Sequence, residues 1–201
     1  DLCLEAGVEL LFHHALVGAV CEDRVIRAAI VQSKSGPGAI EAPVFIDATG
    51  DADLSVMAGC RAEVGGPSGH CQPMTLCFKL ANVAVDRMPP HDEINARYRA
   101  AVARGDIDCP RENVLIFNWT EPDVIHFNTT RIVKHSAING RELSEAELIG
   151  RRQLRQYLDF LRREIPGFEQ ASIHSIAHHI GVRESRRIVG RAKVVREAFT
   201  K

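Results

Sequence analysis

The sequence has no long run of uncharged apolar residues, no excess of one charge and no closely spaced pair of cysteines. No stretch of its 201 residues reaches the roughly 18–20 apolar residues that a helix needs to cross a bilayer. The 25 basic and 26 acidic side chains leave a net charge of −1, whereas nucleic-acid-binding domains usually carry a basic excess. These absences exclude a membrane-spanning helix and argue against a dedicated nucleic-acid-binding protein.

The six cysteines form no C-x-x-C pair, the spacing that indicates a zinc site or a redox-active dithiol. A chain of this length can bury a core without disulfides. We therefore predict reduced, mostly buried thiols in a cytoplasmic protein. Cys71 and Cys77 leave a redox-active disulfide as an alternative, although their spacing favours buried thiols.

Hydrophobic residues make up 45% of the chain and charged residues 25%, as in ordinary globular proteins. Residues 1–60 carry 3 basic and 9 acidic side chains, whereas residues 141–201 carry 13 basic and 8 acidic ones. The basic C-terminal third is compatible with an anionic ligand or with a solvated surface. Because the chain starts at Asp1 and stops within an apparent helical pattern, we expect a fragment of a longer protein.

Turn residues and hydrophobic periodicity predict short strands and one long helix. The elements expected in the first third are strands at 8–12, 15–20, 25–32 and 39–47, a turn at 36–38 and a helix at 51–58. The elements expected later are strands at 74–80, 114–117 and 124–128, helices at 92–104 and 144–165, a strand and loop at 172–182, and a helical or mixed segment at 183–198. Ser144 has the spacing of a capping box and predicts the start of the long helix.

An apolar run at 44–46 ends in the residues Asp47-Ala48-Thr49-Gly50-Asp51. A glycine in such a turn lets a ligand approach the backbone closely, because glycine has no side chain. The N-terminus of the helix that follows would offer free N–H groups to an anion. An ordinary strand-to-helix turn with an Asp cap has the same pattern, and the pattern alone favours that alternative.

Further motifs occur in a fixed order: LEAGVELLFHHALVGAV, VFIDATGDADLSVMAG, QPMTLCFKL, FNTTRI, ELIGRRQLRQYLDFLRREIPGFEQA and HIGVRESRRIVG. Together they resemble FAD-dependent oxidoreductases of the two-dinucleotide-binding-domain type, and the later motifs resemble one bacterial branch of that family. The resemblance implies an α/β to α+β fold. Residues 1–65 would be the later part of a Rossmann-like FAD-binding domain, with a β-ribbon and the Ala-Thr-Gly strand. Residues 66–201 would be a substrate domain with a mixed sheet.

The resemblance also implies FAD as the cofactor. Ala48, Thr49 and Gly50 match the motif that approaches the dinucleotide, and Asp51 follows it. Leu16 matches a strand position whose main chain meets the adenine. The G-x-G-x-x-G fingerprint that holds the FAD pyrophosphate is missing from the sequence.

On the substrate side, Gln72, Met74 and Thr75 resemble the beginning of the second domain, and Arg183 and Arg186 match the Arg-Glu-Ser-Arg-Arg motif of the branch. A fixed guanidinium can stabilise an anionic reduced flavin or hold a substrate carboxylate through two hydrogen bonds. We therefore expect Arg183 or Arg186 to face the substrate. The alternative for this run of charges is a structural ion-pair network or a solvated helix face.

Three histidines lie close together in the sequence. His174 and His178 would share one face of a helix, as zinc ligands do, but the isoleucines around them favour extended structure and we expect no metal. His179 is a candidate acid–base group, because the pKa of histidine is near neutrality.

The leading hypothesis is an FAD-dependent oxidoreductase that transfers hydride between a small organic substrate and the flavin. A homo-oligomer is compatible with the sequence. The alternatives are a non-catalytic α+β binding module and a metal-dependent hydrolase that uses His174, His178 and His179.

Overall fold

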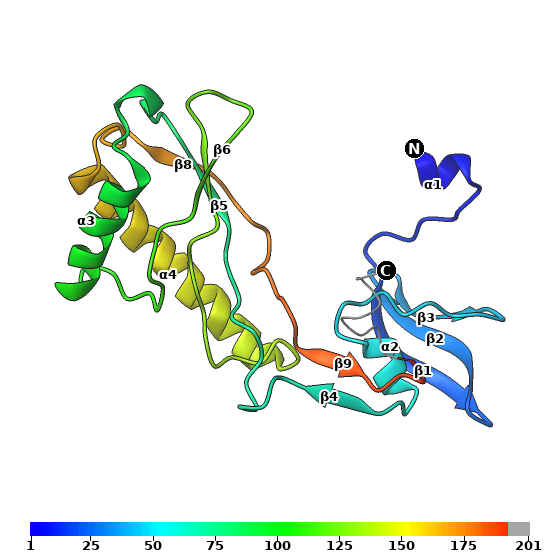
Figure 1. The fold of residues 1–201 in the computed structure, drawn as a ribbon. Coiled ribbons are helices and arrows are strands. Elements are labelled where there is room, and N and C mark those ends of the chain that lie inside the picture. The colour runs from blue at the N-terminus through cyan, green and yellow to red at the C-terminus, as the bar shows by residue number, and fades with distance from the viewer. Residues whose placement is uncertain (193–201) are drawn as a thin grey trace, which may run out of the picture. The chain divides into compact units, whose positions relative to one another are not determined.

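A computed structural model describes residues 1–192, which form two units (Figure 1). Unit 1 comprises residues 1–63 together with the described residues from Arg186 onward, and unit 2 comprises residues 64–185. The chain returns to unit 1 because strand β9 (Arg186–Ile188) pairs with strand β4 (Ala62–Val64). This return differs from the predicted division, in which every residue after 65 belongs to the second domain.

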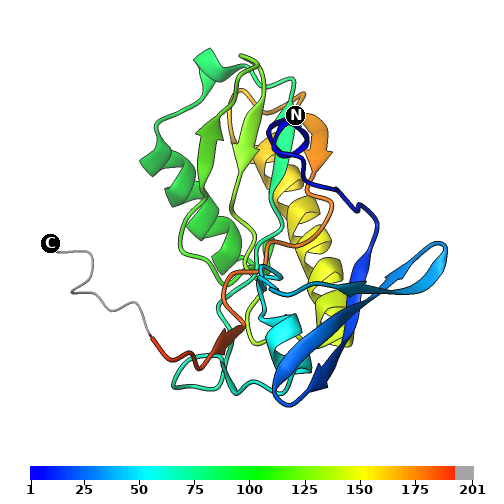
Figure 2. The same cartoon turned by 90° about the vertical axis from the view of Figure 1, so that its right-hand side faces the viewer.

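Unit 1 is built on an antiparallel sheet with the strand order β1–β2–β3, shown with its two hairpins in Figure 2. Its strands are Ala15–Glu22, Val25–Ser33 and Gly36–Glu41, and its helices are α1 (Leu2–Glu5) and α2 (Asp53–Met57). Asp23 and Arg24 both have positive φ, at 50° and 64°. Two such residues make the tight turn whose twist suits a two-residue hairpin. The strands predicted at 15–20 and 25–32 are confirmed.

Two apolar segments of unit 1 are not strands, contrary to prediction. Residues 8–12 form no strand, and β3 ends at Glu41, so that residues 42–47 are irregular. The side chains of Val44 and Ile46 are 73% and 87% exposed. An apolar run favours extended backbone, but a strand also needs a neighbour for its hydrogen bonds. No described strand pairs with residues 42–47.

Turn and helix boundaries in unit 1 also differ from the prediction. The expected turn at 36–38 belongs to β3, whose residues 36–41 pair with β2. The helix expected at 51–58 is shorter, because Ala52 has a left-handed backbone with φ 56° and the helix begins only at Asp53. Asp53 stands in the first turn of this helix, and the N-cap is Ala52.

Unit 2 packs two helices against a four-stranded sheet with the order β6–β7–β5–β8 (Figure 1). The strands are β5 (Phe78–Ala81), β6 (Ile116–Asn118), β7 (Ile125–Phe127) and β8 (Ser172–Ile176); the helices are η1 (Val85–Arg87), α3 (His91–Ala103) and α4 (Gly140–Glu164).

All three strand pairings of this sheet are antiparallel, so the predicted mixed sheet is wrong. The reason lies in the order of the strands. Helix α3 leads from β5 to β6, and β7 lies between those two strands. Helix α4 leads from β7 to β8, and β5 lies between them. Each helix therefore connects strands that run the same way but are separated by one antiparallel strand, and no two parallel strands become neighbours. The described part of the chain shows an α+β fold, and it does not confirm a Rossmann-like arrangement.

The core of unit 2 lies between the sheet and the helices. Phe78 of β5 stacks on Phe127 of β7 at 4.9 Å between ring centroids, and Tyr98 of α3 stacks on Tyr157 of α4 at 5.5 Å. These aromatic rings are fully buried, so the unit buries a large apolar area without disulfides. Gly150 allows α4 to come close to the chain at Leu76, because a Cβ there would lie 2.9 Å from the Leu76 Cβ.

Helix α4 starts earlier than predicted. Its N-cap is Asn139, whose side-chain oxygen accepts hydrogen bonds from the N–H groups of Arg141 and Glu142 at 3.0 and 3.2 Å. Ser144 lies inside the helix, and its hydroxyl donates to the carbonyl of Gly140 at 2.8 Å. The capping-box interpretation of Ser144 is therefore wrong. Leu154, Leu158, Leu161 and Ile165 form a buried apolar stripe at the spacing of a helix, whereas Leu148 is exposed.

All six cysteines are free thiols. Cys109 is buried and Cys71 and Cys77 are partly buried, but Cys3, Cys21 and Cys60 are exposed, so the expectation of mostly buried thiols is wrong. The exposed ones lie in unit 1, which buries few apolar side chains in the described structure. Among the described residues, no helix combines the length and the apolar character that crossing a membrane requires.

Candidate functional site

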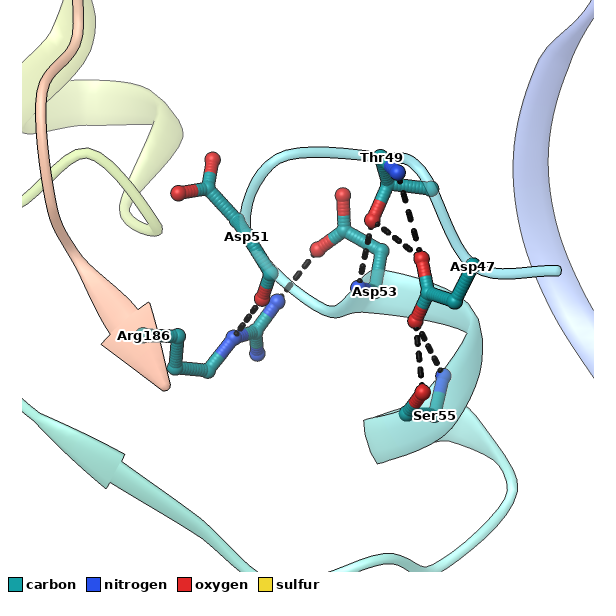
Figure 3. Close-up of polar contacts among 6 residues, drawn as sticks. All are labelled: Asp47, Thr49, Asp51, Asp53, Ser55 and Arg186. Carbon is teal, nitrogen blue, oxygen red and sulfur yellow. Dashed lines mark hydrogen bonds and ion pairs between the residues drawn. The ribbon is translucent and has the colours of Figure 1, made fainter. Parts of the chain in front are cut away.

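The predicted Ala-Thr-Gly motif lies in a turn organised around the carboxylate of Asp47, here called the Asp47 turn and defined as residues 47–53 (Figure 3). One carboxylate oxygen accepts hydrogen bonds from the N–H and the hydroxyl of Thr49, at 3.2 and 2.7 Å. The other accepts from the N–H and the hydroxyl of Ser55, at 2.8 and 2.7 Å. The hydroxyl of Thr49 in turn accepts from the N–H of Asp53 at 2.8 Å. A first-turn N–H of α2 is thus already paired within the protein.

The hydrogen bonds keep Asp47 ionised. Desolvation by itself raises the pKa of this carboxyl, but the bonds from Ser55 and Thr49 favour the charged form more strongly. The net result is a pKa lowered from 3.8 to about 2. A negative charge therefore holds the turn together at every pH near neutrality.

The outer face of the Asp47 turn is open. Ala48, Thr49 and Gly50 are exposed. Gly50 has a φ of 88°, a conformation that L side chains rarely adopt, and a Cβ at this position would meet nothing within 4 Å. A ligand can therefore reach the main chain of these residues directly.

Arg186 braces the same turn from the side of β9 (Figure 3). Its Nε donates to the main-chain carbonyl of Asp51 at 2.7 Å, and its guanidinium forms an ion pair with the carboxylate of Asp53. The Arg186 side chain is only 16% exposed. The structure therefore places Arg186 with the predicted cofactor residues of unit 1, whereas Arg183 belongs to unit 2.

Three of the predicted substrate-side residues meet at a cavity of about 220 Å³ in unit 2, here called the arginine cavity. Its lining residues are Gln72, Pro73, Thr75, Arg111, Arg131 and Arg183. Sequence reasoning had identified Gln72, Thr75 and Arg183. It missed Arg111 and Arg131, although Arg131 stands in the FNTTRI motif and could have been found there.

Met74 does not line the cavity. Its side chain is 1% exposed and packs in a small apolar cluster with Ile132 and Ile180. Met74 and Ile132 also exchange two main-chain hydrogen bonds of 2.9 Å, which hold the two segments together. Met74 therefore does not line the cavity. It holds its own segment against the segment of Ile132.

A second main-chain pair sets the position of Arg183. Thr75 donates to the carbonyl of Gly181 at 3.1 Å, and Gly181 donates back to the carbonyl of Thr75 at 2.7 Å. A Cβ at position 181 would lie 2.9 Å from the Thr75 oxygen, so this close approach requires glycine. The motif Gly-Val-Arg thus brings Arg183 next to Thr75.

Side chains of α3 and α4 form hydrogen bonds with the main chain of the two remaining arginines, Arg111 and Arg131. The buried Gln153 of α4 accepts from the N–H of Arg131 at 2.9 Å and donates to its carbonyl at 3.1 Å. The hydroxyl of Tyr98 in α3 donates to the carbonyl of Arg111 at 3.2 Å. Burial raises the pKa of Tyr98 to about 12, so this hydroxyl keeps its proton.

The other predicted site residues lie elsewhere. Leu16 is in β1 and pairs with Val31 of β2. His174 is exposed on β8, and His178 and His179 are exposed in the segment that follows. None of the three histidines lines the arginine cavity. Within the described part of the chain, His, Cys, Asp and Glu side chains form no group of three or more that could hold a metal ion.

A family model described as FAD dependent oxidoreductase matches residues 1–200 of this chain. The match covers both units and confirms the resemblance inferred from the sequence motifs. No curated protein matches the chain, and neither does any solved structure.

Proposed function

Because the chain belongs to the family of FAD dependent oxidoreductases, we propose that it transfers a hydride between a small organic substrate and FAD. The family match over residues 1–200 carries this proposal. FAD is the cofactor of the family, and when bound it supplies a ring that accepts or returns a hydride, while the protein binds and orients the substrate.

The Asp47 turn fits part of a dinucleotide. The main chain of Ala48, Thr49 and Gly50 would hold it, because these residues are exposed and no side chain stands beside Gly50. The bonds of Asp47 and Arg186 already fix the inner side of the turn. A preformed turn loses little freedom when a ligand binds, which favours affinity.

On the substrate side we assign the facing arginine to Arg183 and not to Arg186. Arg183 lines a cavity with Gln72 and Thr75, and no described carboxylate forms an ion pair with it. Arg186 is occupied by Asp51 and Asp53. A guanidinium fixed beside a substrate stabilises negative charge that develops during the reaction. Arg186 holds the turn that meets the cofactor.

A pair of glycine variants tests the contact between the Asp47 turn and FAD. Gly50→Leu places a side chain in the open space beside the turn. Gly59→Leu is the matched control, because Gly59 has a similar φ of 83° and an equally open Cβ position at the end of α2. The backbone strain is therefore comparable in both variants.

The measurement is the visible absorption of the purified protein after addition of FAD and removal of the unbound cofactor. We expect flavin bands in the wild type and in Gly59→Leu, and a loss of most bound flavin in Gly50→Leu. Equal flavin content in the two variants would remove the turn from the cofactor site. A wild-type protein that takes up no flavin would contradict the proposed function of this chain.

A further inference from the structure

We propose that the arginine cavity binds the carboxylate groups of a small organic diacid, and that such acids are the substrate class. The substrate assignment rests on the hydride-transfer function proposed above. The cavity of about 220 Å³ is smaller than the roughly 300–1,000 Å³ of sites for drug-sized ligands. It suits a molecule of a few carbon atoms.

The arginine cavity carries positive charge that no described ion pair neutralises. Arg111, Arg131 and Arg183 line one cavity, and no described carboxylate lies within ion-pair distance of any of them. A guanidinium does not lose its proton in proteins, so the three charges repel one another until an anion enters. Other arginines of unit 2 are paired in the usual way, such as Arg87 with Glu169 and Arg97 with Glu93.

Two further titratable groups, Cys77 and Glu184, lie near Arg183. Cys77 is close enough to Arg183 to feel its field, but burial raises the pKa of the Cys77 thiol and keeps it neutral. Glu184 follows Arg183 in the chain, and its carboxylate accepts a hydrogen bond of 2.8 Å from the side chain of Gln72.

Two of the cavity arginines each have a buried N–H donor without a hydrogen-bond partner. The Nε atoms of Arg111 and Arg131 are buried, and neither has a hydrogen-bond partner in the described structure. A buried donor without a partner destabilises the folded protein. Nε and a terminal nitrogen of one guanidinium form a fork that matches the two oxygens of a carboxylate. The guanidinium groups of Arg111 and Arg131 therefore keep donor capacity that the described protein does not use.

Hydrogen bonds hold the main chain at or near each of the three arginines. Gln153 holds the main chain of Arg131 on both sides, Tyr98 holds Arg111, and the Thr75–Gly181 pair precedes Arg183. Thr75 also lines the cavity, and its main chain is held by the pair with Gly181. Fixed donors lose little entropy on binding, and this arrangement is typical of a specific oxyanion site.

The charge of the cavity favours two carboxylates over one. A monocarboxylate would neutralise one of the three guanidinium groups, whereas a diacid neutralises two. Inorganic phosphate carries its charge on one tetrahedral centre, so it tests whether the cavity requires two separate carboxylates. Succinate, acetate, phosphate and uncharged succinamide therefore serve as probes.

Binding is measured on the full chain without added flavin, by calorimetry and by the rise in melting temperature, at constant ionic strength. A ligand that binds only the folded protein stabilises it in proportion to the logarithm of its concentration over Kd. We expect succinate to bind most tightly, acetate and phosphate each about tenfold or more weakly, and succinamide not at all. Stronger binding of phosphate than of succinate would overturn the diacid assignment.

Charge-removing variants test the residues. Arg131→Gln and Arg183→Gln should each weaken succinate binding about 10- to 100-fold, because each removes charge-assisted hydrogen bonds. Arg87→Gln makes the same change of charge outside the cavity, and it should bind succinate like the wild type. Without ligand, neither cavity variant should lower the melting temperature, since each relieves repulsion between like charges.

The outcomes separate this proposal from the proposed function. Succinate binding that survives both cavity variants, or that Arg87→Gln lowers equally, overturns the assignment of the cavity. A fall in melting temperature without ligand in both variants would indicate a structural role for the arginines and would also overturn it. Protein that binds succinate but takes up no flavin contradicts the oxidoreductase function and leaves the cavity assignment standing.

Discussion

Replacement of Asp47 by asparagine should destabilise unit 1 by an amount that depends on pH. The carboxylate accepts four hydrogen bonds, two from Thr49 and two from Ser55. Asparagine keeps one acceptor oxygen but turns an NH₂ group toward the remaining donors. The pKa of Asp47, lowered from 3.8 to about 2, corresponds to about 2.4 kcal/mol at 1.36 kcal/mol per pKa unit. Because the side chain is partly exposed, solvent screening reduces the expected loss to roughly 1–2 kcal/mol.

The sign of the pH dependence follows from the direction of the pKa shift. The pKa of Asp47 is lower in the folded than in the unfolded chain, so the ionised carboxylate stabilises the fold above pH 3.8. This stabilisation is lost as the pH falls toward 2. The difference in unfolding free energy between wild type and Asp47→Asn should therefore be complete at pH 6 and should disappear near pH 2.

The assay is urea denaturation followed by circular dichroism at a series of pH values. Trp119 is the single tryptophan and lies in unit 2, so its fluorescence follows that unit separately. Asp159→Asn is the matched control, because Asp159 is an exposed carboxylate of α4 with no described hydrogen bond or ion pair. A difference between wild type and Asp47→Asn that stays constant from pH 6 to pH 2 would refute the reasoning, and so would no difference at all.

Two further predictions concern α4. Gly150→Ala should destabilise the protein by about 1–3 kcal/mol in urea titrations, because the new methyl would lie 2.9 Å from the Cβ of Leu76; the gain of about 1 kcal/mol that this change brings to an exposed helix would indicate that the contact is not close. Asn139→Ala removes the side-chain cap of α4 and should cost about 1 kcal/mol in the same titration, while unchanged stability would contradict the role of the cap.

Helices and hairpins could be predicted where the residues that determine them lie in one short stretch of the sequence. The hairpin of β1 and β2 follows from two short, mostly apolar runs on either side of a polar turn at Asp23. The buried face of α4 follows from apolar residues at helical spacing, since one helix turn repeats every 3.6 residues. The family followed from short motifs spread over the chain, and its model matches residues 1–200.

Predictions failed where a residue's state depends on a distant partner. The segment 42–47 is as apolar as a buried strand, but whether it is one depends on a neighbouring strand. The same holds for Cys3, which is exposed because unit 1 buries few apolar groups. The start of α4 was misplaced because its sequence contains two candidate caps, and the capping hydrogen bonds form at Asn139 and not at Ser144.

The sequence by itself determined the family, the main helices and hairpin, and it pointed to Gln72, Thr75 and Arg183, which line one cavity of unit 2, as candidate site residues. Only the tertiary structure decided that Arg111 and Arg131 join them, because these arginines come from loops far apart in the chain. It also decided that Arg186 braces the Asp47 turn and that the chain returns to unit 1. Local patterns specify backbone conformation, whereas the meeting of like charges at one cavity depends on how the sheet and helices pack.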